Sequence, residues 1–458
     1  MSRQAKKIII ILGALVLLGG AYFGTAAYRQ RQLASAFQPH TPQPRLGNME
    51  WRELVRIEIP GLILERTNGT WELAYLEGGI PPGIELDQRQ IQMMLFPLSN
   101  MWIDRTVDEA PEDVSIFGFD TPSSWVILTD SSGETVEYLR GDMTPTMQHY
   151  FAMQKGDPAV YAVSAYHGGL MGFTLESIRQ RSLFQISNVA DLTRLRIESP
   201  GTRIELVAVT EPDAPRLIST FPRFVLTSPY SLPWGVNSET IQNVLMPLAN
   251  LAIEDFISDD PPSLTPFGLD RATRVFLQTG PRVLDLLIGN EAGGSHYAKL
   301  SGAPGVFTLA GMHSVINARP FDLIDKFPIL VHIDTVDSLT VTSSERRFTA
   351  NFEGAGHNAI FYLNGRRAEE RSFRSFYQAV IGLLVDADYL SPGRLPETYG
   401  AINIEFLLHS PAGERVSITL LPYNRDFYIL RQNGVMEFLI SRSQVHRIFQ
   451  TADAVVFE

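Results

Sequence analysis

Histidine, serine and carboxylate side chains are the groups in this sequence that could carry hydrolytic or metal chemistry. Nine histidines are spread singly along the 458 residues, and none forms the HxxxH or HExxH spacing of a zinc site. His332 and Asp334 could supply two ligands, because alternation in a strand beginning at His332 would place both side chains on one face. A third ligand is lacking nearby, so we favour a plain salt bridge over a metal site.

A serine and a histidine stand next to each other in Gly293-Gly294-Ser295-His296. Adjacent residues of a strand point to opposite faces, so we favour a Gly/Ser-rich loop between two meander strands over a nucleophile and its base. The sequence has no GxSxG elbow, SxxK motif or Walker loop. A triad can still assemble from distant residues, but we predict no catalytic residue and no cofactor.

Two acidic segments, Asp104–Asp113 and Glu254–Asp260, are the strongest candidates for binding a hard cation. Calcium requires several oxygen ligands, yet the spacing matches no EF-hand loop, and Pro261-Pro262 interrupts the second segment. We therefore favour a solvated acidic loop in both places. A docking surface for a basic partner is the alternative, and we predict no metal site.

The two acidic segments lie on a segment that the chain repeats. Ile91–Asp120 reads IQMMLFPLSNMWIDRTVDEAPEDVSIFGFD, and Ile241–Asp270, 150 residues later, reads IQNVLMPLANLAIEDFISDDPPSLTPFGLD. Seven of the first fifteen positions are identical. A degenerate third copy runs from Ser375, with Tyr399-Gly400 in place of the Phe-Gly pair. Such periodicity predicts tandem copies of one structural unit.

The first half of the repeat predicts an amphipathic helix. Asp87 suits the N-cap of a helix that begins at Gln88, and Ile91, Met94, Leu95 and Leu98 form the stripe that such a helix buries. Pro97 should kink or end the helix, because proline cannot donate to the preceding turn. The motif residues of the two helices are Leu95, Pro97, Leu98 and Asn100 and their equivalents Leu245, Pro247, Leu248 and Asn250.

The second half ends in the corner sequences FGFD and FGLD, which we interpret as structural. Phe117 and Phe267 are predicted core anchors, and Gly118 and Gly268 are predicted to form turns that need unusual φ angles. Asp120 and Asp270 are predicted to accept hydrogen bonds from nearby backbone N–H groups. We favour this interpretation over a ligand-binding loop.

Short β-rich runs surround the helix and the corner. Leu54–Ile59, Leu62–Thr67 and Trp71–Tyr75 precede the helix, and Asn68-Gly69 between the last two fits a tight hairpin. Four runs after the corner predict an antiparallel meander, closed by a helix at Leu175–Leu183: Trp125–Asp130, Thr135–Arg140, Tyr150–Gln154 and Val160–Ser164. The predicted fold class is α+β, an N-terminal transmembrane helix followed by three tandem repeat domains, each an antiparallel meander sheet packed with helices.

The amino terminus predicts a membrane anchor. Ile8–Tyr28 carries no charge over 21 residues, about the length a helix needs to cross a bilayer. A cleaved signal peptide is the alternative, since Gly24-Thr25-Ala26 resembles a cleavage site; both place the remainder outside the cytoplasm. We predict an anchor over 1–31, a Pro-rich spacer over 32–49, and repeat domains over 50–187, 188–331 and 332–458.

Composition narrows the class of partner. The chain has no cysteine, which leaves no disulfide, thiolate nucleophile or cysteine metal ligand. The first 31 residues hold five of the 38 basic residues and none of the 50 acidic ones, so the remainder carries 33 basic against 50 acidic. This acidic surplus repels phosphate backbones and argues against nucleic-acid binding.

Three features together resemble the extracytoplasmic family catalogued as domain of unknown function 4340: a helix ending in PLxN, an FG[FL]D corner about twenty residues later, and a meander that closes on a helix. The resemblance rests on Pro97, Leu98, Asn100 and Phe117–Asp120 with their second-copy equivalents, and it covers residues 50–330. It implies a membrane-anchored protein similar to components found with ABC-type exporters of the gliding-motility kind. It implies no catalytic residues.

The sequence hypothesis is therefore a non-catalytic, membrane-anchored extracytoplasmic scaffold, an accessory subunit of an ABC-type export or envelope-motility complex. Its expected partners are the membrane, through the N-terminal helix, and multispan membrane subunits; its oligomeric state is open. One alternative is a ligand-binding receptor with a cleft between the first two domains, near Tyr230 and Trp234. An envelope hydrolase is the third hypothesis, and convergence of carboxylates or a Ser–His pair in one pocket would support it.

Overall fold

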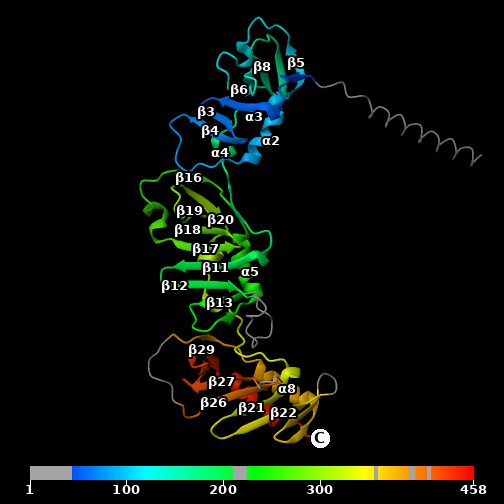
Figure 1. The fold of residues 1–458 in the computed structure, drawn as a ribbon, viewed down its shortest axis with the longest axis vertical. Helices are drawn as coiled ribbons and strands as arrows, with labels where there is room; N and C mark the ends of the chain where they lie inside the picture. The colour runs from blue at the N-terminus through cyan, green and yellow to red at the C-terminus, as the bar shows by residue number, and fades with distance from the viewer. Residues whose placement is uncertain (1–43, 210–223, 355–358, 391–397, 410–413) are drawn as a thin grey trace, which may run out of the picture. The chain divides into compact units, whose positions relative to one another are not determined.

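The computed structural model describes residues 44–209, 224–354, 359–390, 398–409 and 414–458 (Figure 1). Contacts divide these residues into two compact units, which are described separately. Unit 1 holds the described residues up to Ile80 with Ile84–Gln180, and unit 2 holds Pro81–Gly83 with the described residues from Arg181 to Glu458. No helix among the described residues is long and apolar enough to cross a membrane. The predicted anchor, Ile8–Tyr28, lies outside the described residues.

Unit 1 holds one nine-stranded antiparallel sheet with the order β1-β5-β9-β8-β7-β6-β2-β3-β4. Its strands are β1 (Arg45–Leu46), β2 (Leu54–Ile59), β3 (Leu62–Thr67), β4 (Thr70–Leu76), β5 (Met101–Asp108), β6 (Ser124–Asp130), β7 (Thr135–Met143), β8 (His149–Gln154) and β9 (Val160–Ser164). The helical segments are η1 (Trp51–Glu53), α2 (Gln88–Ser99), η2 (Ser115–Phe117), α3 (Ala165–Leu170) and α4 (Leu175–Ile178).

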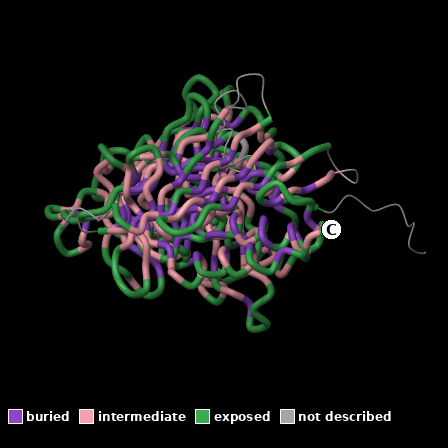
Figure 2. The backbone as a smooth tube through the Cα atoms, turned by 90° about the horizontal axis from the view of Figure 1, so that it is seen from below, coloured by how far each residue is buried: buried purple, intermediate pink, exposed green. Residues whose placement is uncertain are grey.

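Local sequence rules account for most of this sheet. The seven predicted runs match β2, β3, β4, β6, β7, β8 and β9 to within three residues at each end. Asn68 and Gly69 have φ angles of 52° and 86°, as a two-residue hairpin turn between β3 and β4 requires. Buried and less buried positions alternate along β6, which is the pattern of a sheet with one face against a core. Figure 2 shows buried residues among the inner segments and exposed residues in the outlying loops.

The end of the predicted spacer belongs to the sheet. Arg45 and Leu46 form β1 and pair with Trp102 and Met101 of β5, and Leu46 is buried. This strand was not predicted, because two residues are too few to show an apolar alternation. Part of the segment predicted as a spacer therefore belongs to the sheet.

Helix α2 forms as predicted. The Asp87 side chain accepts a hydrogen bond from the Gln90 N–H at 3.0 Å, and the stripe Ile91, Met94, Leu95 and Leu98 is buried. Pro97 lies in the last turn, and the helix ends two residues later at Ser99. The Asn100 side chain then donates to the Met49 carbonyl at 3.3 Å and accepts from Arg45 at 2.9 Å.

The predicted closing helix Leu175–Leu183 is wrong. Helix α4 ends at Ile178, and Arg179 takes an extended conformation that forms a bridge with Leu86. Ser182–Gln185 then form a strand, β10, which pairs with β15 (Asn250–Ala252). The backbone of this stretch finds its hydrogen-bond partners in distant strands, and a sequence window cannot show such pairing.

Unit 2 contains two more nine-stranded sheets. Sheet 2 has the order β14-β13-β12-β11-β17-β18-β19-β20-β16, with β11 (Leu192–Ser199), β12 (Thr202–Ala208), β13 (Phe224–Ser228), β14 (Trp234–Gly235), β16 (Phe256–Ser258), β17 (Thr273–Thr279), β18 (Arg282–Ala292), β19 (Ser295–Leu300) and β20 (Val306–Ala310). Its helical segments are η3 (Val189–Asp191), α5 (Ser238–Ala249), η5 (Thr265–Phe267), η6 (Leu269–Arg271), α6 (His313–Ile316) and α7 (Pro320–Leu323).

Sheet 3 has the order β24-β23-β22-β21-β26-β27-β28-β29-β25. Its strands are β21 (Val336–Thr342), β22 (Arg347–Glu353), β23 (Ile360–Leu363), β24 (Arg366–Ala368), β25 (Ala387–Asp388), β26 (Ile402–Leu408), β27 (Arg415–Pro422), β28 (Phe427–Gln432) and β29 (Val435–Ser441), with η7 (Ile333–Thr335), α8 (Glu370–Ile381) and α9 (Arg442–Asp453).

The three nine-stranded sheets share one topology. In each, a run of hairpin strands leads to a twelve-residue helix, then to a strand at or next to the far edge, then to a four-stranded meander between the two. The helices in that place are α2, α5 and α8 (Figure 1). All paired strands are antiparallel, so the protein is mainly antiparallel β-sheet with a few helices.

Sheets 2 and 3 share one buried core. The ring of Phe438 from β29 lies 4.5 Å from the Trp234 ring and 4.7 Å from the Tyr230 ring, and the Tyr230 hydroxyl donates to Asp388 at 2.8 Å. Trp234 and Tyr230 are only 4% and 9% exposed. The prediction that these two aromatic residues flank a cleft is therefore wrong, because their side chains fill the junction between sheets 2 and 3.

Candidate functional site

The corner motif places a left-handed glycine at equivalent points of sheets 1 and 2. Gly118 and Gly268 have φ angles of 81° and 67°, a region that glycine enters at little cost. A Cβ on Gly118 would overlap the Asp142 side chain, and one on Gly268 would overlap the Asn290 side chain. The predicted turn geometry is confirmed, and the close approach of β7 and β18 adds a second reason for glycine.

A second glycine in each copy, Gly141 or Gly289, lies directly against the corner backbone. These two glycines were not predicted to matter. A Cβ on Gly141 of β7 would overlap the Phe117 carbonyl oxygen, and a Cβ on Gly289 of β18 would overlap that of Phe267. The signal was present as LRGD and LIGN, each a little over twenty residues after its corner glycine. These glycines let the corner backbone lie directly on the meander strand.

The aromatic and acidic corner residues do not act as predicted. Phe117 and Phe267 are only partly buried, and their rings pack edge-on against Phe151 at 5.0 Å and Tyr297 at 5.1 Å. The buried residues are instead Phe119 and Leu269, two places later in each corner. The left-handed glycine lies between these two positions and turns the backbone. The residue after the glycine is therefore buried, and the residue before it is not.

Asp120 and Asp270 are exposed, and neither carboxylate accepts a hydrogen bond among the described residues. The predicted bonds to backbone N–H groups are therefore wrong. In the first corner that role falls to Asp113, which accepts from the Ser115 N–H at 2.8 Å. Hydrogen bonding to Ser115 lowers the pKa of Asp113, since it favours the charged carboxylate.

Sheet 3 has a similar but barer corner. Gly400 has a φ angle of 79°, and a Cβ on it would lie 3.5 Å from Pro422 of β27. That distance is an ordinary van der Waals contact, so the approach is looser than that of Gly118 to Asp142 or of Gly268 to Asn290. Tyr399, which stands for the corner phenylalanine, is 84% exposed, so the third corner keeps the turn without the aromatic packing.

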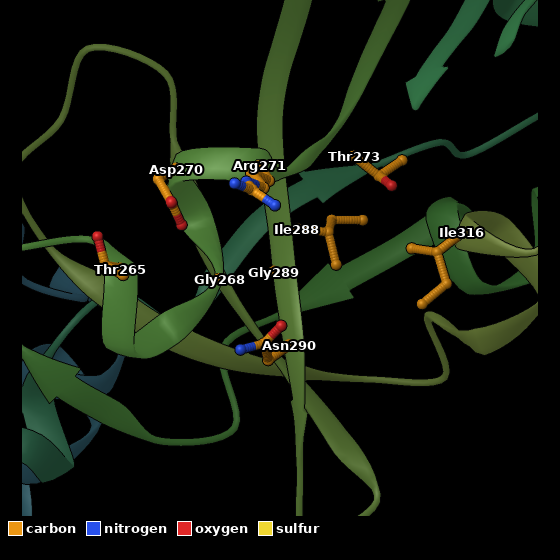
Figure 3. Close-up of a pocket in the computed structure, with 9 residues that line it drawn as sticks. All are labelled: Thr265, Gly268, Asp270, Arg271, Thr273, Ile288, Gly289, Asn290 and Ile316. Atoms are coloured by element: carbon orange, nitrogen blue, oxygen red, sulfur yellow. The ribbon is translucent and has the colours of Figure 1, made fainter. Parts of the chain in front are cut away.

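A pocket of about 420 Å³ lies at the second corner. Figure 3 shows Thr265 and Asp270 on the two short helical turns of the corner, with Ile288 and Ile316 together on the other side of β18. The complete lining is Thr265, Gly268, Asp270, Arg271, Thr273, Ile288, Gly289, Asn290 and Ile316. A predicted turn thus coincides with a hollow that offers a carboxylate, a guanidinium, an amide and apolar surface.

In unit 1 an arginine occupies the equivalent position. Arg140 precedes Gly141 as Ile288 precedes Gly289. Its Nε donates to the Ser123 hydroxyl at 2.9 Å, its Nη1 to the Gly168 carbonyl at 3.0 Å, and its guanidinium lies 5.0 Å from the Tyr150 ring centre. The first corner is therefore filled by the protein's own side chain.

The predicted acidic segments each contribute a contact to a neighbouring strand. Asp104 lies 3.4 Å from His149 Nε2, and Glu254, at the matching place in the second copy, accepts a hydrogen bond from Ser295. Among the residues that the structure describes, no three His, Asp or Glu side chains lie close enough to hold a metal ion. These pairs link β5 to β8, and the segment after β15 to β19.

The two histidines singled out from the sequence, His332 and His296, lie in different environments. His332 does not begin a strand; it caps the turn η7, and its Nδ1 lies 3.7 Å from Asp334, a weak and exposed ion pair. His296, by contrast, is buried in β19, and its Nδ1 has no hydrogen-bond partner among the described residues. Burial lowers the pKa of His296, because desolvation disfavours the charged ring.

A family model described as "Domain of unknown function (DUF4340)" matches residues 80–271 and 225–387. These regions together cover more than half of the chain. The chain belongs to the DUF4340 family. The two DUF4340 regions begin at residues 80 and 225, a short distance before α2 and α5. Both include the second corner, and the second region also includes every residue that lines its pocket. No curated protein and no solved structure matches the chain.

Proposed function

We propose that this DUF4340 protein is a non-catalytic, membrane-anchored extracytoplasmic scaffold built from three tandem copies of one α+β unit. The common order of the three sheets supports the three copies, as does the similar start of the two family matches relative to α2 and α5. Tandem units repeat the same surfaces along one chain, and repeated surfaces suit the binding of protein partners.

The observation that carries the proposal is a pair of exposed apolar side chains at one repeated position. Phe96 of α2 is 46% exposed and Met246 of α5, 150 residues later, is 69% exposed. The opposite face of each helix is buried, so burial in the protein's own core does not account for these side chains. Met93 is exposed one turn before Phe96, and clustered exposed apolar groups mark interaction surfaces.

The amino-terminal sequence and the family resemblance extend the proposal to a location and a partner. Ile8–Tyr28 is uncharged and long enough to span a bilayer. Resemblance to components found with ABC-type exporters favours a multispan membrane subunit as the partner. An apolar helix face then binds the partner's extracytoplasmic loops.

Site-specific crosslinking in native membranes tests both parts. A photoreactive amino acid replaces Phe96 or Met246 in the full chain, with Lys155, an exposed polar residue of the β8–β9 turn, as the matched control position. We expect crosslinks to one multispan subunit from positions 96 and 246 and none from 155, and retention in membranes after carbonate washing. Release by carbonate, or equal products at all three positions, would contradict the scaffold.

A further inference from the structure

One edge strand of sheet 1 is unlike the edge strands of the other sheets. β4 spans seven residues and pairs with β3 alone (Figure 1). The other edge strands, β1, β14, β16, β24 and β25, hold two or three residues each. A short edge strand protects a sheet against unwanted pairing, whereas a longer one is a template for an additional strand. β4 therefore offers the longest open sheet edge among the described residues.

Sheets 2 and 3 fill the equivalent edge with a short strand. Rows of directly opposite residues run from the meander strands β6, β17 and β26 to Leu73, Leu226 and Leu363, so these three leucines occupy one position. Leu226 lies opposite Trp234 of β14, and Leu363 lies opposite Arg366 of β24. In the described part of unit 1, no strand lies opposite Leu73.

Unit 1 keeps the connecting residues but not the edge strand. Glu85 corresponds to Gly235 of β14, since each lies two residues before the N-cap of the repeat helix. The Glu85 carbonyl accepts a hydrogen bond from the Gln180 N–H at 2.9 Å, as the Gly235 carbonyl does from Asp325 at 2.7 Å. Gly235 also pairs with β13, whereas Glu85 belongs to no strand. The place beside β4 is therefore open to a strand from elsewhere.

The outward backbone groups of β4 are oriented for such a strand. The Trp71 N–H donates to the Gln88 side-chain oxygen at 2.8 Å, and the Gln88 amide donates to the Trp71 carbonyl at 2.9 Å. Outward-facing residues alternate along an antiparallel strand, so the N–H and C=O of Leu73 point to the same edge. They have no partner outside the β3–β4 pair among the described residues, and Tyr75 beyond them is 51% exposed.

Charge along this edge favours a basic partner. Glu72 lies directly opposite Glu65 of β3, which lies opposite Arg56 of β2. Arg56 forms an ion pair with Glu65, but no described cation pairs with Glu72. Like charges directly opposite are destabilising, and opposite charges stabilise, so a cation beyond Glu72 is favourable. In sheet 3 the position of Glu72 is taken by Tyr362, and Arg367 of β24 lies opposite it.

We propose that the β4 edge binds a short extended segment of another protein, antiparallel to β4, in which a large apolar residue precedes a lysine or arginine. The apolar side chain lies opposite Leu73, as Trp234 lies opposite Leu226 in sheet 2, and the cation lies opposite Glu72. Backbone hydrogen bonds supply affinity, and the side-chain neighbours supply specificity. A second copy of β4 would bring a second acidic edge instead. This inference goes beyond the scaffold function and does not depend on the contacts of α2 and α5.

Binding of labelled peptides to the full chain in detergent tests the proposal. The probe has the sequence TVTWKVT, followed by fluorescence anisotropy with protein-free detergent as the blank. The controls are TVTWEVT, which places a carboxylate opposite Glu72, and the probe with its tryptophan amide N-methylated, which removes a hydrogen bond to Leu73. We expect each control to bind at least about tenfold more weakly, a difference of about 1.4 kcal/mol. Absence of probe binding, or equal binding of the N-methylated peptide, would overturn the proposal.

Charge reversal places the site on β4. Glu72→Lys should reverse the preference, so that TVTWEVT binds more tightly than TVTWKVT. Glu112→Lys makes the same charge change at an exposed residue before the first corner and should leave the preference unchanged, and thermal unfolding checks that both variants are folded. Equal shifts in the two variants would assign the preference to net charge and overturn the proposal. Dimerisation that Glu72→Lys alters, without peptide binding, would assign the edge to a second copy and also overturn it.

Discussion

Single glycines decide whether the corner can rest on its meander strand. A Cβ at Gly141 would overlap a backbone carbonyl oxygen, that of Phe117, and backbone cannot move aside as a flexible side chain can. We expect Gly141→Ala to lower the free energy of unfolding of unit 1 by about 1–3 kcal/mol, the usual cost of overpacking. Urea denaturation followed by circular dichroism measures this change.

Gly169 in α3 is the matched control, because a Cβ there would meet nothing within 4 Å. Gly169→Ala should be neutral or stabilise by up to about 1 kcal/mol, since alanine has the higher helix propensity. Equal destabilisation by the two substitutions would show that the close approach of Gly141 to the Phe117 carbonyl contributes nothing.

His296 makes the stability of unit 2 depend on pH. Burial lowers its pKa in the folded protein, so below its ordinary value of about 6.5 the unfolded chain takes up a proton that the folded chain resists. Stability is therefore fully present above that pH and falls as the pH drops through it. Glu291 opposes this effect and His313 adds to it through their charges.

Replacing the ring with an apolar one should remove this loss. We expect His296→Phe to show a smaller fall in melting temperature than the parent protein between pH 7.5 and 5.5, and the difference should shrink as the pH rises. His446, which is exposed on α9, is the control, and His446→Phe should follow the parent profile. Parallel profiles for His296→Phe and the parent would contradict the assignment.

At the scale of elements, the repeat helix depends on its N-cap. Asp87 accepts a hydrogen bond from the Gln90 N–H, and loss of such a cap costs about 0.5–2 kcal/mol. Asp87→Ala should lower the urea midpoint of unit 1 accordingly. Asp120→Ala, which removes an exposed carboxylate without a hydrogen bond, should leave the midpoint unchanged; a similar loss in both would point to overall charge instead of capping.

Elements whose signals are local were predictable from the sequence. The β3–β4 hairpin turn and the start of α2 follow from the backbone preferences of Asn68-Gly69 and Asp87, and the buried stripe of α2 follows from helical spacing. The segment Leu175–Leu183 was predicted wrongly because Ser182–Gln185 pair with Asn250–Ala252, far along the chain. Pairing of this kind leaves no mark in a short window.

The pocket could be predicted only in part. The repeated motif includes Gly268 and Asp270, and both residues line the pocket. The replacement of Arg140 by Ile288 is visible in the sequence as LRGD against LIGN, but the sequence does not show which strand lies against the corner. Phe119 and Leu269 are buried, whereas Phe117 and Phe267 were predicted to be. Both positions of each motif are apolar, so the sequence does not show which one is buried.

At the scale of the whole molecule, sheets 2 and 3 are joined by a common hydrophobic core. The buried cluster of unit 2 runs through both sheets, while unit 1 has its own cluster. The Phe438 side chain from sheet 3 contacts Tyr230, Trp234 and Phe321 of sheet 2. Sheets 2 and 3 should therefore open as one cooperative unit.

Removal of the junction ring tests this coupling. Phe438→Ala leaves a cavity between two sheets, and burial of this kind costs about 3–5 kcal/mol when lost. Hydrogen exchange followed by mass spectrometry should show faster exchange in strands of both sheets and no change in unit 1. Phe119→Ala, which empties a buried position of unit 1, should give the converse pattern. Faster exchange confined to sheet 3 in Phe438→Ala would mean that the shared core does not couple the two sheets, and that each of the three sheets unfolds independently.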